Sequence, residues 1–375
     1  MRRVLVSIYI DPEFYPPTKN AIFELAKSSE EVIVLTRNLF NSKEDEYPKN
    51  VRIIRLGKFM SVQESESISF FSKIWTFLKY WFHYQRILLA SNIDTAIFYD
   101  AIPLFIFHIG IKPSKIKYWY HNHDMPDVRF TRKYSIGWFS AKYEHLAMKK
   151  IHFFSLPSKD RLVYYPNWKE MDRFFYIPNF PRLEYFENLD LHHRFENFTI
   201  IFQGAIGEGH GLEDIISILP SFPDVRLILK GPVRESYKEK INVLSALKKV
   251  NDQVQWVGLT SYEELIQLTA KCHLGIAIHQ GKDEVSKTLG TASNKIYEYL
   301  ACGLPIVLHD NEQFRKNVIN SPVVFFYDGQ DANLIEIIKQ VGDDFEVLSI
   351  QARELFCNQY TFEAYFQPVM NVLNA

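Results

Sequence analysis

Residues 291–308 read TASNKIYEYLACGLPIVL and combine the signals of a helix, a tight turn and a buried strand. Ser293 or Asn294 can cap the helix, and the apolar residues that follow recur at helical spacing. Gly303 ends the helix, and the apolar strand 306–308 comes directly after the turn. A helix that passes at once into a buried strand is typical of an α/β domain.

Lys295 and Glu298 give this helix a chemistry that packing does not require. Lys295 lies in the first turn, where a cation faces the positive end of the helix dipole at a cost of roughly 0.3–1 kcal/mol. An anion bound there would reverse the sign, because backbone N–H groups and the ammonium would converge on it. Glu298 follows on the same face, about 5 Å along the helix, and can accept hydrogen bonds from hydroxyl groups. A nucleotide sugar presents a diphosphate and then a ribose diol in that order. The alternative is a solvated surface pair.

The stretch resembles the nucleotide-sugar site of family 4-like glycosyltransferases of the GT-B fold, of the bacterial surface-polysaccharide type. Many members carry K-x-x-E-Y-x-A-x-G-x-P-[IV]-V, and this chain matches the pattern from Lys295 to Val307. The resemblance implies that Glu298 binds the ribose hydroxyls and that basic residues hold the diphosphate. Many members have a second Glu where this chain has Gly290, so the donor-sugar contacts of that residue are not expected here.

The loop Gly204–Gly211 is a second phosphate-binding candidate, because its four glycines let backbone amides approach an anion. A flexible connection is the alternative, and the absence of G-x-G-x-x-G argues against a dinucleotide. In the family the matching loop carries Arg or Lys where this chain has His210. A neutral histidine still donates one hydrogen bond, so we expect a weaker contact and more of the diphosphate charge on Lys295. The donor-binding candidates are Lys295, Glu298, Gly204, His210, Gly211, Ser293 and Asn294.

The loop that contains HNHD, residues 121–124, follows an expected strand and supplies imidazole and carboxylate groups. The carboxyl end of a strand is where open α/β sheets bind ligands. A metal site and a structural polar cluster are the alternatives, but no third ligand cluster supports a metal. The resemblance places this loop near the donor sugar and the acceptor hydroxyl, with His121, His123 and Asp124 as catalytic candidates. Asp124 would act as general base and His123 would contact the sugar or phosphate. The stereochemistry of transfer, retaining or inverting, stays open.

The chain of 375 residues is long enough for two domains, and apolar runs alternate with helical ones throughout. The first half predicts strands at 4–9, 32–36, 51–55, 95–99, 116–120, 151–154 and 174–177, and helices at 20–29, 69–90, 102–109, 134–149 and 158–165. The second half predicts strands at 199–203, 225–230, 254–257, 274–279, 306–308 and 323–327, and helices at 212–219, 237–250, 262–270 and 332–341. We therefore expect an α/β protein with two Rossmann-like domains facing across a cleft, namely residues 1–185 and 186–357. The resemblance adds that a helix in residues 358–375 packs back on the first domain.

The composition limits the classes of function. The net charge of −1 gives no argument for nucleic acid. The three cysteines have no metal-ligand spacing and indicate a reducing compartment. The apolar run 4–10 is too short for a signal peptide, and no run reaches the roughly 18–20 apolar residues of a membrane span. We expect a cytoplasmic protein.

One region is both basic and aromatic. Residues 112–182 contain 14 Lys and Arg against 6 Asp and Glu, with Trp and Tyr among them. The preceding helical stretch 69–90 is also rich in aromatic residues. Two explanations stay open for these residues, packing in the core and contact with anionic lipid. Lipid contact would fit because Trp and Tyr side chains commonly lie at the level of the lipid headgroups beside cationic side chains. Nucleic acid is not favoured, because no binding motif accompanies the charge.

Together these features indicate a glycosyltransferase that moves a sugar from a nucleoside-diphosphate sugar, with UDP favoured, to a glycan acceptor in surface polysaccharide synthesis. A lipid-linked acceptor is favoured, and a peripheral position at the inner face of the plasma membrane is open. No metal or other cofactor is expected. A nucleotide-sugar epimerase of the same fold and a catalytically silent nucleotide-sugar binder are the alternatives.

Overall fold

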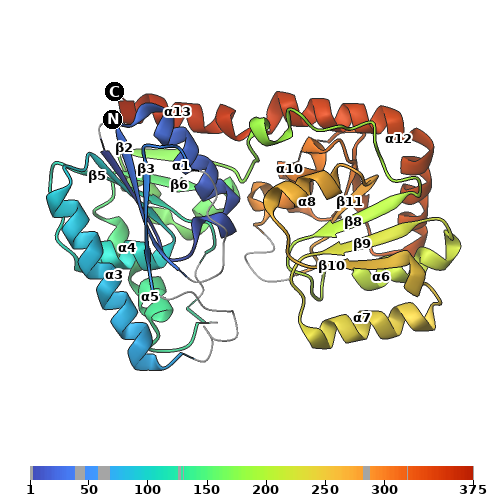
Figure 1. Cartoon of the computed structure of the whole chain (residues 1–375), viewed down its shortest axis with the longest axis horizontal. Helices are drawn as coiled ribbons and strands as arrows, with labels where there is room; N and C mark the ends of the chain where they lie inside the picture. Colours follow the sequence, from blue (N-terminus) through green and yellow to red (C-terminus); the bar gives the residue numbers. More distant parts are fainter. Residues whose placement is uncertain are drawn as a thin grey trace. The chain divides into compact units, whose positions relative to one another are not determined.

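The computed structural model describes residues 3–38, 47–57, 68–125, 128–129, 131–281, 288–318 and 320–374. The chain divides into two compact units: unit 1 comprises residues 1–179 and 362–375, and unit 2 comprises residues 180–361. Each unit contains one parallel β-sheet with helices packed on it, so the predicted α/β class with two Rossmann-like domains is confirmed (Figure 1). The division falls at 179/180 and 361/362 rather than at the expected 185/186 and 357/358.

Unit 1 is built on seven parallel strands in the order β3-β2-β1-β4-β5-β6-β7. The strands are β1 (Arg3–Ile8), β2 (Glu31–Arg37), β3 (Val51–Leu56), β4 (Thr95–Tyr99), β5 (Lys117–His121), β6 (Phe153–Leu156) and β7 (Arg173–Tyr176). The central strands are continuous apolar runs, because helices cover both faces of a parallel sheet. Val4 of β1 lies opposite Val32 of β2 and Thr95 of β4. The strand order reverses between β1 and β4, and ligands bind at the carboxyl ends of strands at such a switch point.

Two separate cores pack on the two faces of this sheet. One lies under α3 (Phe70–Ala90), α4 (Ala101–Ile109) and α5 (Ile136–Met148). The other lies under α1 (Pro16–Ser28) and α13 (Phe362–Asn374), and there the ring of Phe366 lies 6.1 Å from that of Trp119. The last helix of the chain is therefore part of the core of unit 1.

Two helices of unit 1 differ from their predictions. α1 begins at Pro16 rather than at residue 20, because proline is favoured at the first helical positions. The helix expected at 158–165 is the 3₁₀ helix η2 (Lys159–Tyr164). Pro166 follows it closely, which leaves too short a segment for an α-helix.

Unit 2 contains six parallel strands in the order β10-β9-β8-β11-β12-β13. The strands are β8 (Thr199–Gln203), β9 (Arg226–Lys230), β10 (Val254–Val257), β11 (Leu274–Ala277), β12 (Ile306–His309) and β13 (Val324–Tyr327). The helices are α6 (Leu212–Ile218), α7 (Glu235–Leu247), α8 (Tyr262–Thr269), α10 (Asn294–Ala301), α11 (Glu312–Asn317) and α12 (Asp331–Gln359). The strand order reverses between β8 and β11. The glycine loop Gly204–Gly211 directly follows β8, and the start of α10 lies beside the ends of these two strands.

Helix α12 is much longer than the predicted helix 332–341. It continues through Phe345, Leu348, Ala352 and Phe356, which are buried and recur at three- and four-residue spacing. That periodicity is the helical signal, and it extends without interruption past the predicted end. The prediction stopped too early because charged residues surround these four positions on the exposed face.

Candidate functional site

Helix α10 is fixed against the sheet of unit 2 by Tyr299. A Cβ atom added at Gly275 of β11 would lie 2.4 Å from the Tyr299 ring, so only glycine allows this close approach. The Tyr299 hydroxyl accepts a hydrogen bond from the backbone N–H of Gln203 (2.8 Å) and donates one to the carbonyl of Ile276 (3.2 Å). The start of α10 is thereby held at the carboxyl ends of β8 and β11. Ser293 is its N-cap residue and makes no side-chain capping bond.

Lys295 extends from the first turn of α10 over the end of β8. Its Nζ lies 4.1 Å from the centroid of the Phe202 ring, and a Cβ atom at Gly204 would lie 3.5 Å from it. Burial lowers the pKa of Lys295 to about 7, although the nearby carboxyl of Glu298 acts in the opposite direction. Ion pairs between described residues of unit 2 include those of Arg182, His193, Lys240 and Arg315, and Lys295 takes part in none of these.

Glu298 is buried, with 7% of its surface exposed. One carboxylate oxygen accepts a hydrogen bond from the hydroxyl of Tyr262 on α8 (2.9 Å), and the other accepts one from the side-chain amide of Gln203. Burial raises the pKa of Glu298 to about 7, and these hydrogen bonds oppose the shift. The interpretation of Lys295 and Glu298 as a solvated surface pair is therefore wrong. Tyr262 was not among the sequence candidates, because nothing in its local pattern distinguishes it from other helix residues.

The glycine loop after β8 is tied to the end of β11. Gly204 and Gly211 both have positive φ values, +118° and +68°, which favour glycine. His210 donates a hydrogen bond from Nδ1 to the carbonyl of Ile278 (3.2 Å), since a carbonyl can only accept. Burial lowers the pKa of His210 to about 4, and the charge of Lys295 adds to that shift. The sequence predicted that neutral His210 would donate a hydrogen bond to a phosphate. In this orientation its only N–H group is engaged with Ile278, so His210 could donate to a phosphate only after Nε2 is protonated.

In unit 1, His123 is held on all sides. Its Nδ1 lies 3.3 Å from Asp100, its Nε2 lies 3.1 Å from the hydroxyl of Thr18, and its ring stacks between Tyr15 and Tyr99. Only 2% of the residue is exposed. With both nitrogens occupied, His123 supports the loop rather than offering a free group to a substrate.

His121 is also buried, and its Nδ1 lies 2.8 Å from the hydroxyl of Ser155. Its Nε2 is buried and has no hydrogen-bond partner within the described ranges. Burial holds the pKa of His121 well below its usual range, and His123 and Arg161 add to that shift. His121 is therefore neutral and lies beneath the loop, in edge-to-face contact with His123 at 4.6 Å.

Asp124 is exposed and lines a pocket of about 270 Å³ at the switch point of unit 1. Its carboxylate accepts a hydrogen bond from Tyr15 (3.3 Å). Asp100 lines the same pocket and accepts a bond from the backbone N–H of His123 (2.8 Å). The structure thus brings two carboxylates to one pocket, and Asp100 was missed. The sequence signal that could have identified Asp100 is its position directly after strand β4. In the structure its φ is 68°, a strained value for a residue other than glycine.

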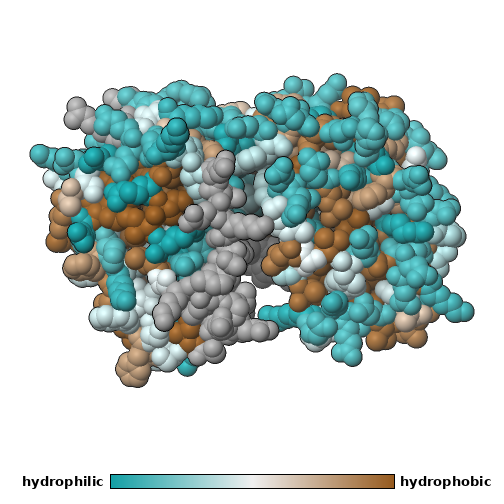
Figure 2. Space-filling view, viewed as in Figure 1, coloured by the Kyte–Doolittle hydropathy of each residue, from teal (hydrophilic) through white to brown (hydrophobic). Residues whose placement is uncertain are grey.

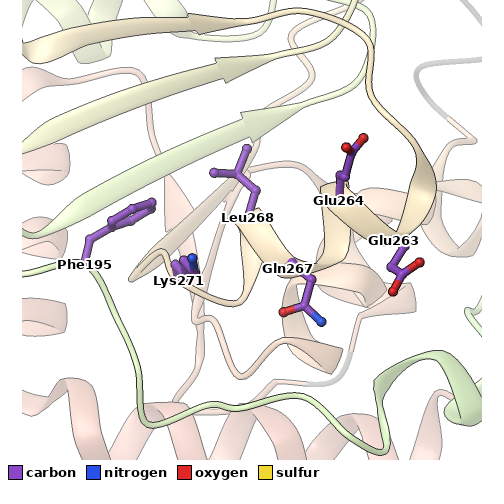
Figure 3. A pocket seen from close by; sticks show the side chains of 6 residues that line it. All are labelled: Phe195, Glu263, Glu264, Gln267, Leu268 and Lys271. Carbon is purple, nitrogen blue, oxygen red and sulfur yellow. The ribbon is translucent and has the colours of Figure 1, made fainter.

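A different depression of about 350 Å³ lies on the outer side of α8 (Figure 3). It is lined by Phe195, Glu263, Glu264, Gln267, Leu268 and Lys271, none of which is a sequence candidate. Within the described ranges, no group of three or more histidine, cysteine or carboxylate side chains is placed to hold a metal ion. Likewise, none of the described helices is long and apolar enough to cross a membrane.

Comparison with known proteins finds similarity in the region that contains α10. The family model of glycosyl transferases group 1 matches residues 190–349. Chitobiosyldiphosphodolichol beta-mannosyltransferase of Dictyostelium discoideum is 33% identical over 81 residues, which are 22% of this chain and 15% of that protein. The chain thus spans only a small part of that relative.

Several solved structures resemble the whole chain, and two of them serve as examples. Sucrose-phosphate synthase of Thermosynechococcus elongatus has a TM-score of 0.73 at 14% identity, covering 100% of this chain and 98% of that one. HepE of Anabaena, in complex with UDP and glucose, has a TM-score of 0.66 at 14% identity, covering 100% of both chains. At these identities the likeness establishes the fold. Residues 190–349 thus match the model of glycosyl transferases group 1, and the whole chain has the GT-B fold.

Proposed function

We propose that the chain transfers a sugar from a nucleoside-diphosphate sugar to a glycan acceptor. The observation that carries the proposal is the ammonium of Lys295 beside the open backbone of Gly204, at the start of α10. Burial disfavours that charge in the free protein, and an anion would favour it. A diphosphate bound there would also accept hydrogen bonds from the first backbone N–H groups of α10.

The donor's ribose would lie one turn deeper, at Glu298. The bonds from Tyr262 and Gln203 hold the carboxylate in one orientation before any ligand arrives. A carboxylate has about four lone-pair positions, so it can still accept bonds from a diol. UDP is the favoured nucleotide, supported by the resemblance of the fold to that of HepE, which was solved with UDP.

The acceptor would use the pocket of unit 1 that contains Asp124 and Asp100. Two carboxylates in one pocket suit the binding of sugar hydroxyls, and Asp124 is exposed enough to take a proton from one of them. His123 and His121 would act by positioning the loop. The use of Asp124 as a base depends on whether transfer retains or inverts the anomeric configuration.

A lipid-linked acceptor is favoured by the outer face of α3. Apolar side chains stand exposed along it at helical spacing, among them Phe71 (81%), Trp75 (61%) and Phe82 (59%). Lys79 and Arg86 are exposed on the same helix. On the face of unit 1 that Figure 2 shows, brown hydrophobic side chains lie among teal hydrophilic ones. Aromatic and cationic groups together suit the headgroup region of an anionic membrane.

A catalytically silent donor-binding protein is the second candidate. The observation in its favour is Gly290, which is buried and has no side chain where many relatives have a Glu. Such a protein would bind the donor and leave it intact.

The test begins with a thermal-shift screen of UDP, GDP, ADP and CDP and their common sugar derivatives, because a ligand of the folded state raises the melting temperature. The stabilising donor is then incubated with a lipid-linked glycan. Release of free nucleoside diphosphate together with a lengthened glycan is expected. An altered sugar nucleotide without transfer would identify an epimerase, and binding without turnover would identify the silent protein. A chain that no nucleotide stabilises would contradict the proposal.

A further inference from the structure

Two histidines from different parts of unit 2 lie close to Lys295, and a third lies close to one of them. His210 comes from the loop after β8, His279 follows β11, and His309 is the last residue of β12. The rings of His210 and His279 meet edge to face at 5.0 Å. His210 and Lys295 share a platform, since both lie close to the ring of Phe202, at 4.9 and 4.1 Å. β8, β11 and β12 are neighbours in the parallel sheet, so these groups lie near the carboxyl ends of adjacent strands.

Two of the imidazoles have nitrogen atoms that nothing satisfies. His279 Nε2 and His309 Nδ1 are buried and have no hydrogen-bond partner among the residues that the structure describes. His210 has its Nδ1 engaged with the carbonyl of Ile278, which leaves Nε2 for another partner. Buried polar atoms are nearly always paired, so unpaired ones in one place call for a ligand or a proton.

The nearby acids are already engaged. Glu213, which attracts a proton to His210, pairs with Lys240 at 3.0 Å. Asp214 accepts a hydrogen bond from Tyr327 (2.9 Å), and Asp310 forms an ion pair with Arg315 beyond His309. Glu298 lies beside Lys295 and is held by two neutral donors.

In the free protein, burial disfavours the charged forms of His210, His279 and Lys295, and repulsion adds to this effect at the two histidines. The pKa of His279 is held well below its usual range by burial, and Lys295, His210 and His309 add to that shift. The pKa values of His210 and Lys295 are lowered by burial to about 4 and about 7. A single anion placed among these groups would reverse the repulsion for all of them at once, because a nearby opposite charge favours each protonated form by about 1–3 pKa units.

We propose that His210, His279 and His309 form, with Lys295, a diphosphate-binding cluster that takes up protons when the nucleoside diphosphate binds. The inference rests on the proposed donor site and extends it to His279 and His309, which lie outside the family pattern quoted above. The incoming protons turn the bare nitrogens into donors that point at phosphate oxygens. Binding should therefore strengthen as the pH falls toward 6, where Lys295 is already charged.

Histidine protonation can be followed directly with UDP as the probe. The protein is labelled with ¹³C at its histidines, and the imidazole Cε1–H signals are titrated from pH 5 to 8.5 with and without saturating UDP. The variants His279→Phe and His309→Phe keep a ring in place and assign two of the signals. The titration midpoints of at least two cluster histidines should rise by about 1–3 pH units with UDP. His193, whose side chain is 85% exposed, is the internal control and should not move. Uridine, which has no phosphate, should move none.

Calorimetry provides a second measurement. UDP binding at pH 6 in two buffers of different ionisation enthalpy gives the number of protons exchanged. The wild type should take up about one proton more than the double variant His279→Phe/His309→Phe, and bind at least about tenfold more tightly at pH 6 than that variant. If UDP raises the melting temperature and binds with unchanged imidazole midpoints, the proton-uptake cluster is wrong while the donor site stands. If no nucleoside diphosphate binds, the proposed function falls with it.

Discussion

The side-chain amide of Gln203 donates a hydrogen bond to Glu298, and its orientation is fixed by a third residue. The Gln203 carbonyl oxygen lies 3.0 Å from the hydroxyl of Thr269, which also donates to the carbonyl of Leu265 (2.7 Å), and the amide nitrogen faces the carboxylate. The last residue of β8 thereby connects α8 and α10 and sets the direction of Glu298. The ribose-binding group is in place before the ligand arrives, which removes part of the ordering cost of binding.

Replacing Glu298 with Gln should weaken donor binding by about 1.5–3 kcal/mol, because a charge-assisted bond to the diol is lost. Its effect on the ligand-free protein should depend on pH. The folded protein retains a proton on Glu298 up to about pH 7. An unfolded chain releases it near pH 4.5, so stability is lost as the pH rises between these values.

Glu298→Gln lacks this loss, so its stability relative to the wild type should rise by up to about 3 kcal/mol from pH 4.5 to 7. Melting temperatures across that range measure the difference. Glu263→Gln, an exposed change on α8, should follow the wild-type curve. Two parallel curves for Glu298→Gln and the wild type would show that the carboxyl titrates normally.

Replacing Lys295 with Met should separate the free and bound states. Without ligand the melting temperature should hold or rise, because a charge in an unfavourable place is removed. The rise in melting temperature caused by UDP should shrink by the equivalent of about 1.5–3 kcal/mol, and more than the rise caused by uridine. Lys271→Met, at an exposed position, is the matched control. A variant that is less stable without ligand but binds UDP normally would make Lys295 a structural residue.

The exposed face of α3 should bind anionic membranes. The wild type is expected to co-sediment with anionic vesicles and to be released as salt rises. Phe71→Ser with Trp75→Ser should abolish the co-sedimentation without unfolding the protein, since both side chains are exposed. Leu247→Ser with Leu259→Ser removes two exposed apolar side chains from unit 2 and should change nothing. Equal partition of wild type to neutral and anionic vesicles would exclude the electrostatic contact.

Asp124→Asn should lower turnover by about 10²–10⁴-fold if the carboxylate takes the acceptor's proton. The stabilisation by UDP should stay the same, because Asp124 lies in unit 1 and the donor candidates lie in unit 2. Asp172→Asn, an exposed substitution in the same unit, is the control for a general loss of charge. A change confined to the KM for the acceptor would assign Asp124 to binding rather than to proton transfer.

The sequence predicted most accurately the features that depend on residues close together in the chain. Helix α10 and strand β12 lie where capping, periodicity and the Gly303 turn place them, because those signals act over a few residues. The same reasoning gave Lys295 its unusual position in the first turn. It did not reveal that Glu298 is buried and held by Tyr262, because this contact joins residues far apart in the chain.

The acceptor-side loop shows the same limit. Polar residues after a strand predicted a site, and Asp124 does line a pocket there. Which of the neighbouring side chains face inward depends on tertiary packing, and His123 is enclosed by Thr18 and two tyrosines from other elements. Asp100 escaped notice because its role comes from a backbone conformation that composition does not announce. His279 and His309 were missed because they converge only when β11 and β12 pair.

Because helix α13 belongs to unit 1, the two units have all their residues available at different times during synthesis. Unit 2 is one continuous segment, whereas unit 1 needs residues 362–375 to cover the core around Trp119 and Phe366. A ribosome adds roughly 5–20 residues per second, so roughly ten to forty seconds separate the end of β7 from the start of α13. Throughout that interval the nascent amino-terminal half has an apolar sheet face without its last helix. Unit 2 is complete once residue 361 has been made, whereas unit 1 waits for residues further along the chain.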